Sequence, residues 1–288
     1  MIQRLVLVAA LTALTACGAT VSRVEWVGTH VWTEDAPGFG GLSGIEISED
    51  GSRFTIVNDS ARLYTGRIAR DGVAITGVQI DSTTRLRAPD GTRLRGKDRD
   101  AEGLALGPDG QLFVSFEGPA RVHAYATPDA TPAALPQHPE FAGMMLNSAL
   151  ESLAIDAQGR LYAIPERSGR IDRPFPVYRY DGTGWREAFA LPRRDAFLAV
   201  GLDIGPDGRL YLLERDFTGI GFRTRLRRFG PDGGGEEVLL QTRTGTYDNL
   251  EGISVWRDAG GALRVTLVSD DNFRFYQQTQ IVEFRLTD

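Results

Sequence analysis

Five stretches of the chain repeat one pattern of hydrophobic and polar positions. Each has alternating apolar residues, a turn that contains glycine, a second apolar run and an acidic end, as in "DAEGLALGPDGQLFVSFEG" from Asp100. Such alternation predicts β-strands, and a glycine turn between two runs predicts a hairpin. The other hairpins begin near Gly41, Leu150, Val200 and Asn249, so the period is about 50 residues.

This period, with two clear strands in each unit, is typical of a β-propeller. We therefore predict an all-β protein, a β-propeller with five repeat units and five or six blades. A sixth, degenerate blade would fall within residues 61–100. The run "TQIVEFRL" near the C-terminus is predicted to pair with residues 24–32 and close the ring, because closure removes exposed sheet edges. The proline-rich insert at residues 127–147 is expected to form a loop over one face of the disc.

The first seventeen residues differ from the rest. Arg4 precedes an apolar run at residues 5–16, which is too short to span a bilayer because a spanning helix needs about 20 residues. The run ends in "LTAC", which resembles the bacterial lipobox, and Gly18 follows the cysteine. We expect Cys17 to be the lipidated first residue of an exported chain. It would lie in the periplasm or cell envelope, held by its lipid anchor, with the outer membrane favoured by Gly18. The predicted segments are a signal peptide (1–17), an N-terminal segment with the ring-closing strand (18–39) and the propeller domain (40–288).

Composition narrows the function classes. The net charge of -6 does not favour a nucleic-acid partner, which requires a basic face. Cys17 is the only cysteine, so an internal disulfide or a cysteine-based zinc site is not expected. The sequence has neither an HExxH motif nor a GxSxG motif. Oligomeric state is left open.

Acidic residues lie at the open ends of the predicted hairpins, opposite their turns. The two open ends of a hairpin lie on the same side, so acidic residues at the start of the first strand and at the end of the second are expected to lie close together. These residues are Glu102 with Glu117, Glu151 with Glu166, Glu251 with Asp270 and Asp271, Asp59 in the first hairpin, and Asp203, Glu214 and Asp216 in the fourth. If the hairpins form the inner strands, all five blades direct these groups to one mouth of the central channel. The aspartates in the turns, such as Asp109 and Asp207, would lie at the opposite face as ordinary turn residues.

Crowded carboxylates cost several kcal/mol per ion unless they are paired or bind a metal. A divalent cation would relieve this cost, and we predict Ca²⁺ because it tolerates irregular oxygen ligands. We predict metal ligands at Asp59, Glu102, Glu117, Glu151, Glu251 and Asp270. Glu166 or Asp271 would act as general base, and Arg167 or Arg215 would stabilise negative charge. The competing interpretation is that the glutamates are hydrogen-bonded staples between blades.

The motifs resemble the phytase-like domain family, described as having esterase-like activity of phytase. The resemblance is carried by "GLSGIEIS" from Gly41, "DAEGLAL" from Asp100, "NSALESLAI" from Asn147, "GLDIGPDGRLYLLERDF" from Gly201, and "DNLEGISV" with "LVSDDNF". It covers about residues 40–285 and implies a phosphoesterase-type activity carried by acidic residues, here Asp59, Glu102, Glu151, Glu166, Glu251 and Asp271. The chain departs from the family at Ala149 and Ser152, where glycine is usual.

Three functions remain open. The favoured one is a metal-dependent esterase or phosphoesterase that acts on a small anionic ester. The second is a lactonase of the gluconolactonase type, with one cation held by glutamate, aspartate and amide ligands such as Asn58, Asn147, Asn249 and Asn272. The third is a periplasmic binding or scaffold propeller without catalysis. The sequence does not decide whether the protein is an enzyme.

Overall fold

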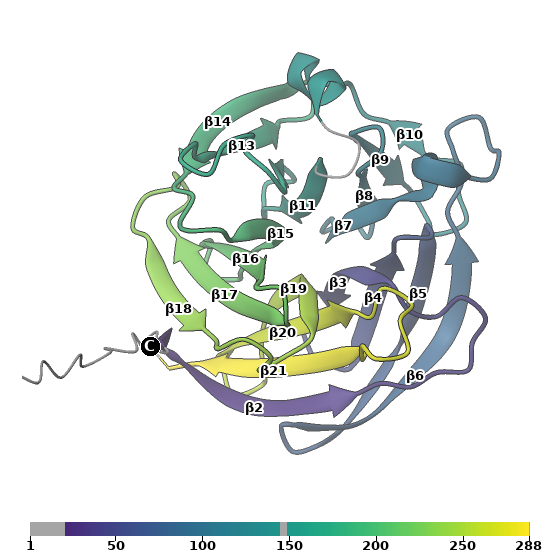
Figure 1. Ribbon diagram of the computed structural model, residues 1–288. Coiled ribbons are helices and arrows are strands. Elements are labelled where there is room, and N and C mark those ends of the chain that lie inside the picture. The colour runs from purple at the N-terminus through teal and green to yellow at the C-terminus, as the bar shows by residue number, and fades with distance from the viewer. Residues whose placement is uncertain (1–20, 145–148, 288) are drawn as a thin grey trace, which may run out of the picture.

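The computed structural model describes residues 21–144 and 149–287. Within these residues, five antiparallel sheets stand in a ring around a central axis (Figure 1). The prediction of an all-β propeller is confirmed, and the number of blades is five. Cys17 and the rest of the predicted signal peptide lie outside the described residues.

Each blade has four strands, arranged in order from the axis to the outer edge, and blade 4 has a fifth. Blade 1 contains β3 (Leu42–Ile47), β4 (Arg53–Asn58), β5 (Arg62–Asp71) and β6 (Ala74–Arg85). Blade 2 contains β7 (Ala101–Leu106), β8 (Leu112–Phe116), β9 (Arg121–Tyr125) and β10 (Ala133–Ala134). Blade 3 contains β11 (Leu150–Ile155), β12 (Leu161–Pro165), β13 (Phe175–Tyr180) and β14 (Trp185–Leu191). Blade 4 contains β15 (Leu198–Ile204), β16 (Leu210–Phe217), β17 (Phe222–Phe229) and β18 (Glu237–Gln241), with β1 (Val21–Ser22) at its outer edge. Blade 5 contains β19 (Asn249–Arg257), β20 (Leu263–Asp270), β21 (Gln280–Leu286) and β2 (Val24–Val31).

The ring closes through blade 5, as predicted. The N-terminal strand β2 pairs antiparallel with the C-terminal strand β21, with Val24 opposite Leu286 and Val31 opposite Gln280. Both ends of the described chain are therefore held in hydrogen-bonded sheets. This arrangement leaves no open edge between the first and last blades.

Two expectations about connecting segments need correction. Residues 61–100 form no sixth blade, because β5 and β6 complete blade 1 and the short 3₁₀ helix η1 (Gly96–Arg99) follows. The insert at 127–147 is not wholly a loop, because β10 adds the outer strand of blade 2. Its 3₁₀ helix η2 (Pro139–Gly143) buries Phe141 against Tyr178 of blade 3. Apolar contact with a neighbouring blade thus outweighs the disruptive effect of the prolines.

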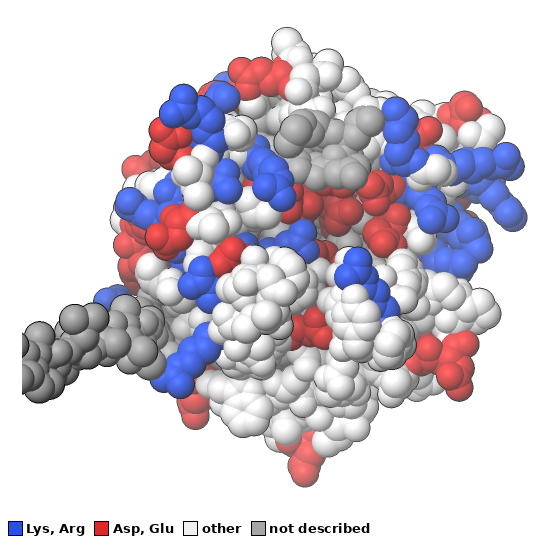
Figure 2. Space-filling model, viewed as in Figure 1, with Lys and Arg blue, Asp and Glu red and all other residues white. Residues whose placement is uncertain are grey.

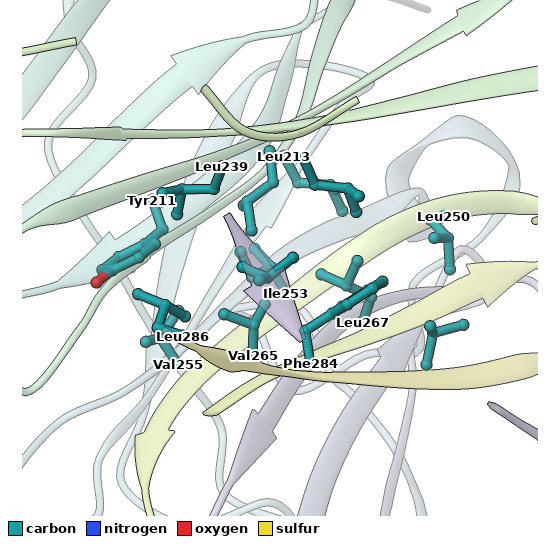
Figure 3. Packing of buried hydrophobic residues seen from close by; sticks show 14 of the residues in the cluster. Tyr211, Leu213, Leu239, Leu250, Ile253, Val255, Val265, Leu267, Phe284 and Leu286 are labelled. Carbon is teal, nitrogen blue, oxygen red and sulfur yellow. The ribbon is translucent and has the colours of Figure 1, made fainter. Parts of the chain in front are cut away.

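The hydrophobic core consists of separate layers between neighbouring blades. The layer between blades 4 and 5 shows the principle, with Leu213 and Leu239 from one blade facing Ile253 and Leu267 from the next (Figure 3). Equivalent clusters lie between the other pairs of adjacent blades. Each sheet is therefore buried on both faces, which accounts for apolar residues at nearly every inner position. In the described residues, no helix is long and apolar enough to cross a membrane.

The inner strands leave very little space along the axis. The channel is lined by the aliphatic side chains of Ile45, Leu104, Leu153, Leu202 and Ile253, and its cavity volume is about 10 Å³. This is about the space that one water molecule needs. The narrow channel therefore separates the residues at one opening from those at the other.

Candidate functional site: an acidic mouth on the propeller axis

One local irregularity positions the predicted glutamates. The pairing register shifts near the start of the inner strand in every blade, as between Leu150 and Ser152 or between Leu250 and Gly252. A β-bulge of this kind re-aims a side chain. The residues at the bulges are Ser43, Glu102, Glu151, Val200 and Glu251. Three of the five blades therefore direct a glutamate to the same mouth.

The residue after each bulge packs against the next blade. A Cβ placed on Gly252 would lie 2.2 Å from the carbonyl oxygen of Ser43, and one on Gly201 would lie 2.4 Å from that of Glu251. Close approach of backbones requires glycine at these positions. Blade 3 has Ser152 instead, yet its inner strand keeps the same bulge. Serine at this position is thus compatible with the same bulge that the other blades have.

Blades 1 and 2 supply a group of closely spaced carboxylates to the mouth. Carboxylate oxygens of Asp100, Glu102 and Glu117 all lie within 4.8 Å of one another. Asp59, from the end of β4, faces Asp100, and one of its oxygens, Oδ1, is buried without a hydrogen-bond partner. We refer to Asp59, Asp100, Glu102 and Glu117 as the acidic cluster.

Blades 3, 4 and 5 are tied together by Arg215. Its guanidinium donates to Glu251 of blade 5, to Asn249 Oδ1 at 2.7 Å and to Glu166 Oε1 of blade 3 at 3.2 Å. Asn249 in turn donates to Glu251 Oε1 at 2.9 Å and to Asp270 Oδ2 at 3.4 Å. This side of the mouth therefore combines carboxylates with a mostly buried cation. Figure 2 shows the acidic side chains in the hollow at the centre of this face, with basic side chains around them.

Burial and mutual repulsion raise the pKa values of the acidic groups in the mouth. Burial, together with the neighbouring Asp100, raises the pKa of Asp59 to about 7 and that of Glu117 to about 8. Burial and the charge of Glu251 raise the pKa of Asp270 to about 8 and that of Glu102 well above its ordinary value. Without a bound cation, the mouth therefore retains protons near neutral pH.

Glu151 and Glu251 follow the same rule, since burial raises the pKa of each carboxyl. Burial alone would lower the pKa of Arg215, but Glu251, Glu151 and Glu166 outweigh it and raise that pKa. Arg215 therefore stays positively charged, whereas the carboxyl groups around it retain protons near neutral pH.

These features fit a hard divalent cation. The acidic cluster offers several oxygens within reach of one ion and one buried oxygen that nothing else satisfies. Ca²⁺ binds six to eight such oxygens in flexible geometry. Asp100, Glu102 and Glu117 would hold it, because their carboxylate oxygens lie within 4.8 Å of one another. The other predicted ligands, Asp59, Glu151, Glu251 and Asp270, lie near enough for their charges to act within the same mouth.

The remaining predicted residues divide into rim and loop positions. Arg167 lies at the rim and its Nε donates to Glu166 Oε2 at 3.0 Å. Asp271 lies in the loop after β20, where its Oδ1 accepts from the backbone N–H groups of Gly41 and Phe273 at 3.0 Å each and its Oδ2 accepts from Thr279 at 3.1 Å. The structure thus brings Glu166 into the mouth and uses Asp271 to anchor loops. The role of Glu166 or Asp271 as general base stays a prediction.

The fourth hairpin was wrongly assigned to this mouth. Asp203 lies at the opposite opening of the channel, where its negative charge raises the pKa of Glu46 and its carboxylate accepts from the backbone N–H of Val255. Glu214 is fully buried within blade 4 and binds Arg225 and Arg227 there. Asp203 lies further along β15, opposite Tyr211, which places it at the other end of the channel. Side chains alternate between faces along a strand, so Glu214 and Arg215 point to different faces. The contribution of blade 4 to the mouth is Arg215.

Asp100 was missing from the predicted ligands, although it shares the cluster with Glu102. The available signal was its position two residues before Glu102, since residues at this spacing face the same side of an extended strand. Asn58 belongs to the first hairpin but donates to the backbone of Gly38 and Gly40. It is therefore a structural residue of the loop before β3.

The fold and this site define a closed five-bladed propeller with a charged axial mouth. The family profile described as "Esterase-like activity of phytase" matches residues 37–273. The chain therefore belongs to the Phytase-like family. No curated protein matches it.

Among solved structures, the chain is similar in fold to the two following proteins at low identity. An exo-β-1,3-galactanase from Phanerochaete chrysosporium has 12% identity, with 91% of this chain and 65% of that chain covered and a TM-score of 0.54. An α-L-arabinofuranosidase from Podospora anserina has 13% identity, with 93% and 98% covered and a TM-score of 0.53. Similarity at this level shows the fold alone.

Proposed function

We propose that the protein is a metal-dependent esterase or phosphoesterase that acts on a small anionic ester at the acidic mouth. The observation that carries this proposal is the acidic cluster, where several carboxylates share one small volume and Asp59 Oδ1 has no partner. Ca²⁺ is the divalent cation that suits these oxygen ligands, and when bound it would polarise the ester oxygen and lower the pKa of a bound water.

The protein's own residues supply the remaining chemistry. Arg215 presents a fixed positive charge in the mouth, which would orient an anionic ester and stabilise negative charge that develops on it. Arg167, half exposed at the rim, would meet the same anion as it enters. Glu166 lies between these arginines and would accept the proton of the attacking water. Each of its oxygens keeps a second lone pair for this purpose.

Two observations favour this function over its alternatives. A lactonase site would use amide ligands, but the amide of Asn58 is held by loop carbonyls and that of Asn249 by Arg215 and Glu251. Of the other two candidates, Asn147 lies outside the described residues and Asn272 is an exposed loop residue after β20. A pure scaffold would use all its carboxylates as staples. Arg215 does act as such a staple, and Glu117 of the acidic cluster shares a hydrogen bond with Glu151 of blade 3. Among the described residues, however, no arginine forms an ion pair with the acidic cluster, and Asp59 Oδ1 has no partner.

The test compares the wild type with Glu102→Gln and Glu251→Gln, with Ca²⁺ and with a chelator. Ca²⁺ at about 100 times its dissociation constant should stabilise the wild type by about 2.7 kcal/mol. Glu102→Gln should lose most of this gain and most hydrolysis of aryl phosphates and aryl esters. Glu251→Gln should show the same loss and also destabilise the metal-free protein, because Glu251 pairs with Arg215.

The matched control is Asp109→Asn, an exposed carboxylate in the turn at the opposite end of blade 2. It should respond to Ca²⁺ like the wild type. If melting temperature and hydrolysis ignore the metal in wild type and both glutamine variants, the mouth is not a metal site, and the scaffold function replaces this proposal.

We also propose that the chain is exported and lipid-anchored through Cys17, on the strength of the lipobox-like run before it. Two or more acyl chains give stable anchoring, whereas one is marginal. The catalytic mouth would then face the periplasm or the cell exterior.

A further inference from the structure

The loop between β20 and β21 carries an aromatic side chain to the edge of the acidic mouth. Phe273 is half exposed, and the loop crosses from blade 5 towards blade 1 (Figure 1). A Cβ placed on Gly41 would lie 2.7 Å from Cε2 of Phe273 and 2.5 Å from Asp59 Oδ1. The ring and this oxygen therefore border the same small space, where a side chain at position 41 would otherwise stand. An apolar surface thus lies directly beside the acidic cluster.

The backbone that presents this ring is strained. Asn272 and Phe273 are consecutive and have φ values of 49° and 51°, in the left-handed region that residues with a bulky side chain rarely adopt. Two carboxylates hold the turn: Asp270 Oδ1 accepts from the N–H of Asn272 at 2.6 Å, and Asp271 Oδ1 accepts from that of Phe273 at 3.0 Å. Strain of this kind is found most often at active sites and ligand contacts. The structure thus fixes an aromatic ring where a conformationally easier residue would form the same turn.

Two glycines make room for the ring. Gly40 and Gly41 both have positive φ values, and a Cβ on Gly40 would lie 3.1 Å from Cδ1 of Phe273. The N–H of Gly41 donates to Asp271 Oδ1 at 3.0 Å, which ties this glycine segment to the loop that carries the ring. Part of the ring is therefore packed against the backbone and fixed in position. The part that stays exposed is available to a ligand in the mouth.

A small anionic ester has two parts with different needs. Its charged group suits Arg215 and a cation at the acidic cluster, as proposed above. Its organic group gains most from a surface that removes apolar area from water, and a flat group gains further from contact with an aromatic ring. Phe273 is the aromatic side chain that the structure places beside Asp59.

We propose that Phe273 is a specificity-determining residue, which contacts the organic group of the ester while the charged group occupies the mouth. This inference rests on the proposed function and deepens it. It names the substrate class as esters whose organic group has a flat apolar surface, such as an aryl group.

The kinetic test compares the wild type with Phe273→Asn. Asparagine adopts the left-handed conformation readily, so this variant should keep the turn and the melting temperature while it loses the ring. With Ca²⁺ present, the KM for phenyl phosphate should rise roughly tenfold, the upper end of what one aromatic contact provides. The KM for methyl phosphate, and the kcat for both substrates, should stay unchanged. Each substrate is compared between two proteins, so the different reactivity of the two leaving groups cancels.

Two further variants complete the kinetic test. Phe273→Tyr keeps the ring and should behave like the wild type. Phe275→Asn makes the same chemical change in the same loop, at a ring that is fully exposed and contacts the exposed ring of Tyr276. It should also behave like the wild type. A rise in KM of equal size for both phosphates, or the same rise in Phe275→Asn, would overturn the proposal.

A binding test separates this inference from the proposed function. Phenylphosphonate and methylphosphonate, whose carbon–phosphorus bonds an esterase does not break, are titrated into the full chain by calorimetry with Ca²⁺. The wild type should bind phenylphosphonate roughly tenfold more tightly than Phe273→Asn does, and the two proteins should bind methylphosphonate equally. This pattern in a protein that hydrolyses no ester supports the aromatic contact and rejects the proposed function. Metal-dependent hydrolysis with equal binding of phenylphosphonate by both proteins keeps the function and rejects the contact. Phenylphosphonate that does not bind the wild type would also overturn the contact.

Discussion

Replacing Asp59 tests whether the ionised carboxylates of the acidic mouth destabilise the metal-free protein. Burial and the neighbouring Asp100 raise the pKa of Asp59 from the ordinary 3.8 to about 7. The folded protein therefore keeps this proton at pH values where the unfolded chain has released it. The associated stability is fully present below about pH 4 and is lost as the pH rises towards 7.

The magnitude follows from the difference between the two pKa values. Each unit corresponds to about 1.4 kcal/mol, so ionised Asp59 costs the metal-free fold up to about 4 kcal/mol at about pH 8. Asp59→Asn removes this charge at nearly constant volume. The variant should be more stable than the wild type by up to about 4 kcal/mol at pH 8, which is roughly 10 °C in melting temperature. At about pH 4 the two proteins should be equal, because the carboxyl is neutral in the folded wild type.

With Ca²⁺ bound, Asp59→Asn should destabilise the protein at pH 8 instead of stabilising it. A bound cation compensates the charge of Asp59 in the wild type, whereas asparagine offers a weaker, neutral ligand. Urea unfolding with chelator at about pH 8 and pH 4, and again with excess Ca²⁺, measures all three cases. The exposed turn residue Asp109, changed to asparagine, is the control. If Asp59→Asn destabilises the metal-free protein at pH 8, the account of a repulsive, proton-retaining mouth is wrong.

Four further outcomes are expected. Arg215→Met should destabilise the fold by about 3–5 kcal/mol in thermal or urea unfolding, because it leaves buried carboxylates unpaired; a loss below 1 kcal/mol would show that the staple is unimportant. Gly252→Ala should cost about 1–3 kcal/mol through backbone overlap, whereas Gly184→Ala, with open space around it, should cost far less in the same assay. Glu46→Gln should stabilise the protein at about pH 8 and lose this advantage as the pH falls, because burial and the neighbouring Asp203 raise the pKa of Glu46; an effect that does not change with pH would contradict the raised pKa. Cys17→Ser should abolish labelling by radioactive palmitate, and persistence of the label would exclude Cys17 as the anchor.

Local patterns in the sequence predicted the fold and part of the site. Alternation, glycine turns and a constant period depend only on neighbouring residues, so the five hairpins and the closing pair of β2 and β21 could be identified in advance. The positions of Glu102, Glu151 and Glu251 could also be predicted, because each occupies the same place in a repeated motif.

The tertiary structure decided how these groups are compensated. Blade 4 places Val200 at its bulge and directs Arg215 from the neighbouring strand into the mouth, where it meets carboxylates of two other blades. The hairpin pattern cannot show this, because a bulge changes which face a side chain takes and the partners come from other repeats. Asp203 illustrates the same limit, since its place along β15 sends it to the opposite opening. Charges that lie far apart in the chain come together only when the ring closes, and their pairing depends on that geometry rather than on any local motif.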